Sequence, residues 1–352
     1  MALYSAHGFT HGHLGQKGLP AVVRMSRTVG AVTPLRGFRF LQMAALGAYL
    51  IFLPVYLVER GLSLEQVGLV VTCAVAVQVV AGMFWGMLAD HLGRTVPFLA
   101  QALAVSALGM LVLPRLTTFV QFLALGMARS LLAPMMEGLV VASLFRGVGE
   151  DGRGAAYSGF AVWGSMGWAA GVVVAGVVAR TFGTSAAFYL SGALFAGAIL
   201  PVIRMPERRK FRPRGQRGLV NTLGLLRDRR VLWLLSASLP LVIAINAASQ
   251  FFPVRLRTVG ASAALIGLIY MVPSLLEIPV YLGMGRRSDR WRDRRPLLLW
   301  ASGVYVAMFL LIFAVGDPWK LFLGYSLLAP LAWAPFLMGA FTLMAELVPR
   351  RR

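Results

Sequence analysis

Residues 64–94 read LEQVGLVVTCAVAVQVVAGMFWGMLADHLGR. After Glu65, this stretch carries no charged side chain until Asp90. A helix of roughly 20 apolar residues crosses the hydrocarbon core of a membrane, which is about 30 Å thick. Because backbone groups in lipid must find their hydrogen-bond partners within the segment, the stretch predicts a transmembrane helix that ends at a charged boundary.

The composition of the whole chain extends this pattern. Of 352 residues, 58% are apolar and 13% are charged, and the mean hydropathy is +0.74. Soluble chains are nearer half apolar and a quarter charged, so the composition excludes a soluble two-domain enzyme and a disordered protein. The single cysteine, Cys73, excludes an intrachain disulfide and a multi-cysteine metal site.

Ten apolar stretches are long enough to span a membrane, and they predict an all-α membrane protein built as a helical bundle. We place the spans at residues 39–58, 64–88, 96–113, 118–145, 155–179, 185–203, 231–252, 263–283, 296–315 and 321–345. One long connection divides them into six and four. We therefore expect a polar, basic and disordered segment at 1–37, a six-helix bundle at 38–203, a basic linker at 204–230 and a four-helix bundle at 231–352.

Basic residues gather on one side of these spans. The chain has 34 Lys and Arg residues against 13 Asp and Glu. Of the 34, 27 fall in the N-terminal segment, alternate loops, the central linker and the C-terminus, six fall in the other loops, and Arg129 lies within a span. Cytoplasmic loops carry such an excess, so we expect cytoplasmic termini, a location in the cell membrane and contact with anionic lipid head groups. The charge then requires no nucleic-acid partner.

The two halves of the chain are similar at an offset of 199 residues. Six proline, glycine and aspartate matches share this register: Pro54 with Pro253, Gly61 with Gly260, Gly68 with Gly267, Gly86 with Gly285, Asp90 with Asp289, and Pro97 with Pro296. Parallel repeats of this kind occur in transporters. The second half lacks counterparts of the spans at 155–179 and 185–203, which implies a parent with six plus six spans.

A charged motif follows the second span. Gly86 allows close helix approach, Gly93 allows a turn, and Asp90 can pair with a basic residue such as Arg94. The repeat places Asp289 at the equivalent position of the second half. Such a motif acts either as a latch between two conformations or as a solvated turn.

The string GMLADHLGR at residues 86–94 resembles the loop signature of the major facilitator superfamily, and GRRSDR at 285–290 resembles its second copy. The resemblance implies a secondary transporter that works by alternating access, with a substrate cavity between its halves. Tyr157 and the residues WGSMG at 163–167 resemble the branch of sugar and phenylpropionate permeases. The Gly-Pro pair that drug–proton antiporters of the family usually carry in the fifth span is absent.

Three charged residues lie away from the ends of predicted spans: Arg129, Glu137 and Glu277. Charges within the bilayer are unfavourable and usually face a cavity. We expect Arg129 to bind an anionic or hydrogen-bonding substrate, or to pair with a carboxylate when the site is empty. We expect Glu137 and Glu277 to exchange protons. A polar clamp between helices, without transport, is the structural alternative.

Three neutral residues complete the candidate site. Gln78 aligns with Glu277 in the repeat, so each half presents a polar group at the same depth. Asn246 and Gln250 lie on the seventh span. They line the same cavity or form hydrogen bonds between helices.

The function expected first is proton-driven transport, a symport, of a small organic solute by a monomer that uses no metal and no cofactor. An efflux antiporter for drugs or metabolites is one alternative, and a truncated membrane protein without transport activity is another. An enzyme is not expected. The sequence holds no phosphate-binding loop, dinucleotide loop or catalytic triad, and its four histidines lie outside the spans.

Overall fold

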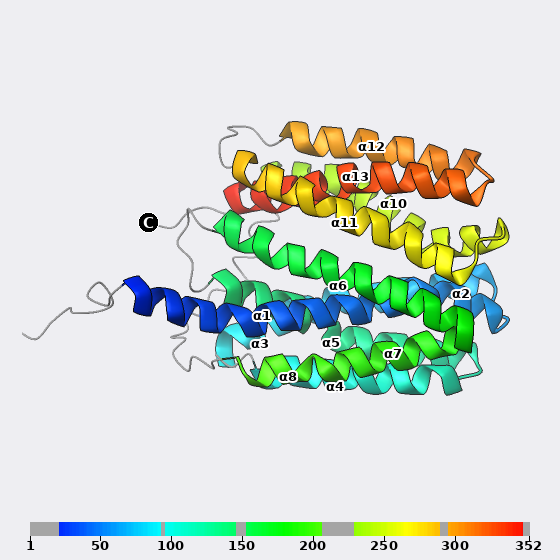
Figure 1. Cartoon of the computed structure of the whole chain (residues 1–352), viewed down its shortest axis with the longest axis horizontal. Coiled ribbons are helices and arrows are strands. Elements are labelled where there is room, and N and C mark those ends of the chain that lie inside the picture. Colours follow the sequence, from blue (N-terminus) through cyan, green and yellow to red (C-terminus); the bar gives the residue numbers. More distant parts are fainter. Residues whose placement is uncertain (1–20, 93–95, 146–152, 206–228, 289–294, 348–352) are drawn as a thin grey trace, which may run out of the picture.

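The structure, a computed structural model, describes residues 21–92, 96–145, 153–205, 229–288 and 295–347. All regular structure in these ranges is helical (Figure 1). Ten helical stretches within them are long and apolar enough to cross a membrane. The predicted all-α fold with ten spans is therefore confirmed.

The helices follow the predicted spans closely, with differences at their ends. They are α1 (Ala21–Leu50), α2 (Phe52–Glu59), α3 (Leu64–Leu92), α4 (Val96–Val112), the 3-10 helix η1 (Leu113–Arg115), α5 (Phe119–Phe145), α6 (Arg153–Phe182), α7 (Thr184–Gly197), α8 (Ile199–Ile203), α10 (Arg229–Thr258), α11 (Ala263–Ser288), α12 (Arg295–Ala314) and α13 (Pro318–Leu347). α1 begins inside the segment expected to be disordered, because extending an existing helix needs no new nucleus.

Two helix breaks fall where a proline ring meets a carbonyl group. Pro54 and Pro201 each lie four residues after the last residue of the preceding helix, α1 or α7. A proline ring clashes with the carbonyl four residues before it, and it cannot donate a backbone hydrogen bond. These two spans are each built from a pair of helices, α1 with α2 and α7 with α8, whereas prolines such as Pro134 and Pro253 lie inside continuous helices.

The helices form two bundles that lie side by side, α1 to α8 and α10 to α13 (Figure 1). α6 (green) lies between them and packs against α1 in its own bundle and against α11 (yellow) in the other. One apolar cluster extends from the first bundle into α10 and α11 and includes the buried side chains of Phe52, Phe188 and Ile269. A second cluster around Tyr305 joins α10, α12 and α13. Large apolar side chains such as Val80 and Leu299 are exposed, as expected for helices that face lipid.

Glycines bring α6 close to its two neighbours. A Cβ atom added at Gly167 or Gly171 would lie 2.1 Å from a backbone oxygen of α1. On the other face of α6, a Cβ atom added at Gly176 would lie 2.9 Å from a backbone oxygen at the start of α11. Small residues allow membrane helices to pack backbone against backbone. The glycines of α6 thus allow α1 on one face and α11 on the other to approach it closely.

An ion pair also joins the bundles, where α2 and α10 end. Arg257 Nη2 donates to Glu59 Oε1 over 3.0 Å, and each side chain is 40% exposed. An exposed ion pair contributes about 0–1 kcal/mol to stability. This pair therefore adds little to the free energy that holds the two bundles together. The contact lies at the end of the molecule opposite to the start of α1 (Figure 1).

Candidate functional site

α1 and α5 are joined by an ion pair. Arg39 Nη1 lies 2.5 Å from Glu137 Oε1, and Gln42 Nε2 donates to the same oxygen over 3.3 Å. The Arg39 side chain is 13% exposed and that of Glu137 is 48% exposed. The pair therefore lies at the edge of the bundle, with the carboxylate on the accessible side.

α6 makes room for the guanidinium of Arg39. A Cβ atom added at Gly164 would lie 2.9 Å from Arg39 Nε, and the Phe160 ring centre lies 4.8 Å from Arg39 Cζ. A cation over an aromatic ring gains roughly 0.5–2 kcal/mol. Sequence reasoning placed Arg39 among the cytoplasmic cations and missed this role. Glu137 could have indicated this role from the sequence, because a carboxylate within a span needs a nearby countercharge.

Arg129 is held by a tyrosine. Its Nη2 donates to Tyr49 Oη over 3.1 Å, and its Cζ lies 4.6 Å from the centre of the Tyr49 ring. Arg129 is 8% exposed, and its Nε has no hydrogen-bond partner among the described residues. The carboxylate partner expected for Arg129 is not found in this part of the chain, since Glu137 pairs with Arg39. Arg129 thus keeps an unused donor, which a hydrogen-bonding ligand would satisfy.

Glu277 lies where the two bundles meet. It extends from α11 toward α6, and its Oε2 lies 3.5 Å from Ser165 Oγ, at the long limit of a hydrogen bond. Neither of the two salt bridges between described residues includes it. A carboxylate without a cation is unfavourable within a membrane unless a proton neutralises it.

The second bundle contributes aromatic rings and unused polar atoms. The rings of Phe252, Tyr270 and Tyr325 form a cluster whose centroids are 4.8 to 6.0 Å apart. Tyr270 Oη and Gln250 Oε1 are buried and have no hydrogen-bond partner within the described ranges. This bundle therefore offers both a hydroxyl group and a carbonyl acceptor to a polar ligand.

Two other predicted residues have different surroundings. Gln78 is exposed on α3, although its repeat equivalent Glu277 contacts α6. Asn246 is also exposed, and its amide donates to the carbonyl oxygen of Val242 in its own helix over 2.8 Å. Neither residue joins the contacts that surround Arg129.

The charged motif at residues 86–94, which we expected to act as a conformational switch in a loop, begins within a helix. α3 continues to Leu92, so Gly86 and Asp90 have helical backbone and do not lie in a loop. Gly93, Arg94 and Asp289 lie outside the described residues.

Ten apolar helices in two bundles, with buried polar groups in both, define a multi-pass membrane protein built like a solute transporter. Residues 32–352 match the MFS_1 like family, so this chain belongs to that family of the major facilitator superfamily. Its relatives are transporters and not enzymes. The predicted resemblance to this superfamily is confirmed.

Two relatives show the range of transported compounds in the family. The maltose permease of Geobacillus stearothermophilus is 28% identical over 266 residues, which are 74% of this chain and 66% of the permease. The multidrug resistance protein MdtG of Serratia proteamaculans (strain 568) is 26% identical over 299 residues, which are 80% of this chain and 71% of MdtG. This chain thus spans just under two thirds of the length of the permease.

Solved structures confirm the fold. The nucleoside transporter NupG superposes with a TM-score of 0.72 at 16% identity, over 90% of this chain and 82% of NupG. A bacterial homologue of the human lysosomal transporter Spinster, in an inward-facing and unoccupied conformation, superposes with a TM-score of 0.69 at 14% identity, over 92% of this chain and 76% of the homologue.

Proposed function

We propose that this chain is a secondary active transporter that moves a small organic solute across the cytoplasmic membrane by alternating access, coupled to protons. The observation that carries the proposal is Glu277, a carboxyl that pairs with no cation among the described residues and reaches from one bundle to Ser165 of the other. Proton binding there changes the charge at a contact between the bundles. A ligand that prefers one arrangement of the bundles shifts their equilibrium toward it.

The unused polar atoms support a polar solute. Arg129 and Tyr49 provide donors from the first bundle, and Tyr270 and Gln250 provide a hydroxyl and an acceptor from the second. Aromatic rings beside Tyr270 offer faces on which a sugar or a nucleobase can pack. A hydroxyl-rich or anionic organic solute fits these groups better than a purely apolar one.

Drug efflux is the second candidate, and the relatives named MdtG favour it. An efflux pump would exchange protons for an apolar or cationic compound. The excess of basic residues in alternate loops supports cytoplasmic termini for either direction of transport. We propose that the working unit is a single chain.

Transport by reconstituted protein tests the function. The full chain is inserted into liposomes that contain a pH-sensitive dye, and a pH gradient is imposed. We expect the addition of maltose, uridine or an aromatic carboxylate to cause proton flux that protein-free liposomes lack. Flux with a cationic dye alone would favour efflux, and no flux with any compound would contradict a transport function.

Arg129→Gln is expected to lower the apparent affinity for substrate about tenfold or more, because hydrogen bonds from a charged donor contribute about 1.5–3 kcal/mol. Initial uptake rates over a range of substrate concentrations measure this effect. Arg115→Gln is the matched control, because Arg115 is exposed at the end of η1. Equal affinity in both variants would show that Arg129 does not contact substrate.

A further inference from the structure

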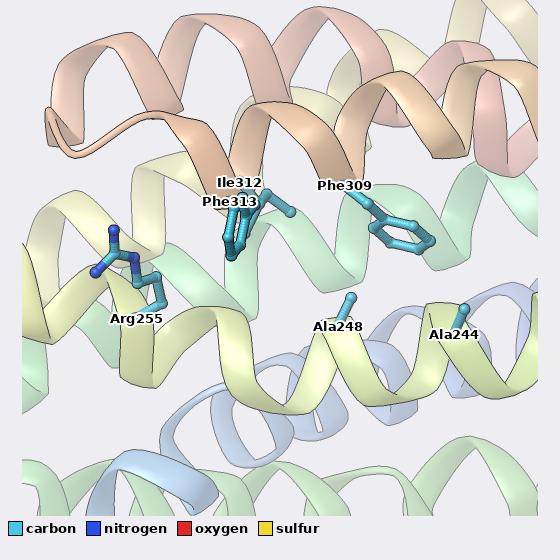
Figure 2. A pocket seen from close by; sticks show the side chains of 6 residues that line it. All are labelled: Ala244, Ala248, Arg255, Phe309, Ile312 and Phe313. Carbon is cyan, nitrogen blue, oxygen red and sulfur yellow. The ribbon is translucent and has the colours of Figure 1, made fainter.

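A groove lies between α10 and α12, away from the contacts between the bundles. Its volume is about 660 Å³, and it is lined by Ala244, Ala248 and Arg255 of α10 and by Phe309, Ile312 and Phe313 of α12. Figure 2 shows the two alanines facing the α12 side chains, with Arg255 at one end. Ligand pockets usually measure roughly 300–1,000 Å³, so the groove can hold a small molecule or a chain.

The internal repeat shows what covers the same surface in the first bundle. At the offset of 199 residues, Ala244, Ala248 and Arg255 correspond to Ala45, Tyr49 and Tyr56. α7 covers those three positions. Ser191 donates to the Ala45 carbonyl oxygen over 2.8 Å, and the ring of Phe188 lies 6.5 Å from that of Tyr49 and 4.9 Å from that of Tyr56.

In the second bundle the groove is open and its chemistry differs. Alanine at 248 replaces a tyrosine and leaves space, and arginine at 255 replaces another tyrosine and adds a charge. Phe313 is 86% exposed, so no described helix covers the groove. A phenylalanine like Phe188 of α7 would contact the Arg255 guanidinium through its ring only and would bring no countercharge.

The length of the groove matches one leaflet of a membrane. Arg255 and Ala244 are eleven residues apart, which corresponds to about 16 Å along a helix. This is near half of the roughly 30 Å hydrocarbon core. Arg255 lies at the outer end of this stretch, close to the last residue of α10, Thr258. The cation is thus at the depth of lipid head groups, and the apolar walls extend toward the middle of the membrane.

Arg255 is available for an anion. It is exposed, and neither of the two ion pairs between described residues includes it. The neighbouring Arg257 is paired with Glu59. A guanidinium binds phosphate oxygens through two parallel hydrogen bonds, which a lipid with a phosphate and a net negative charge offers.

We propose that the groove between α10 and α12 binds an anionic phospholipid, with one acyl chain along Ala244 and Ala248 and the phosphate at Arg255. The site goes beyond the proposed transport function and does not depend on it. The site differs from the surrounding bilayer because it combines a groove as long as one leaflet with a cation that has no ion-pair partner in the described part of the chain.

Photo-crosslinking in lipid nanodiscs tests this proposal. A benzophenone amino acid replaces Phe313 in the full chain, and the nanodiscs contain phosphatidylcholine with a minority of phosphatidylglycerol. Mass spectrometry identifies the crosslinked molecule. We expect phosphatidylglycerol adducts to exceed their share of the lipid about fivefold, since an arginine near the membrane surface contributes about this factor toward anionic lipid.

Two variants in the same background separate the site from general lipid contact. Arg255→Gln is expected to reduce phosphatidylglycerol adducts to the share of that lipid in the nanodisc. Arg180→Gln, which changes an exposed arginine in the last turn of α6, outside the groove, is expected to keep the enrichment. Equal adduct ratios in these two variants, no enrichment in the parent protein, or a crosslink to a polypeptide instead of a lipid would each overturn the proposal.

Discussion

Glu277→Gln is expected to abolish accumulation of substrate against its gradient and to leave the exchange of substrate across the membrane intact. Glutamine keeps the size of the side chain and a hydrogen-bond contact with Ser165, but it cannot gain or lose a proton at neutral pH. Proteoliposomes with an imposed pH gradient measure accumulation. The same liposomes without a gradient measure exchange of labelled for unlabelled substrate.

Glu137→Gln is the matched control, because it makes the same chemical change in another span. Its carboxylate is paired with Arg39, so the amide leaves a mostly buried guanidinium without a countercharge. For a pair of intermediate exposure we expect a loss of about 1–3 kcal/mol of stability, with coupling preserved in the protein that folds. Persistent pH-driven accumulation in Glu277→Gln would contradict the role of Glu277 and assign the proton to another group. Loss of accumulation in Glu137→Gln alone would assign it to Glu137.

The sequence predicted the spans because each is a local property. A stretch of apolar residues long enough to cross lipid needs no knowledge of its neighbours, and all ten stretches are helical in the structure. The break before Pro54 was less predictable, because its repeat equivalent Pro253 lies inside the uninterrupted helix α10, and the predicted first span ran across Pro54.

The candidate site depends on packing between distant segments, and there the sequence was less informative. Arg39 and Glu137 are 98 residues apart, and only the approach of α1 to α5 brings them together. The repeat suggested that Gln78 and Glu277 have similar surroundings. They differ because α3 packs mainly on α5, whereas its equivalent α11 packs on α13 and also on α6.

α6 connects these observations. On one face its glycines contact α1, which carries Arg39 and Tyr49. On the other face it meets α11 at Ser165 and Glu277. Any movement of the two bundles against each other must change the contact of α6 with α11 and the smaller contact of α2 with α10, while the contact of α6 with α1 stays within one bundle. We therefore expect the α1 contact to tolerate substitution least.

Gly171→Ala is expected to destabilise the protein strongly. The added Cβ atom would lie 2.1 Å from the carbonyl oxygen of Ala44, and a helix backbone cannot move aside as a flexible side chain does. Forcing an extra group into a packed interior typically costs about 1–3 kcal/mol, and backbone contact places this substitution at the upper end. Thermal unfolding in detergent, followed by the loss of the monodisperse elution peak, measures the effect.

Gly159→Ala, on the same helix, is expected to change stability in the opposite direction. No atom lies within 4 Å of a Cβ atom added at Gly159, so the substitution meets no steric conflict. Alanine is favoured over glycine in a helix by about 0.5–1 kcal/mol, and we expect this variant to unfold at a slightly higher temperature than the parent. If both variants shifted the unfolding temperature in the same direction, helix propensity would outweigh packing, and the close approach of α1 and α6 would not be what holds the first bundle together.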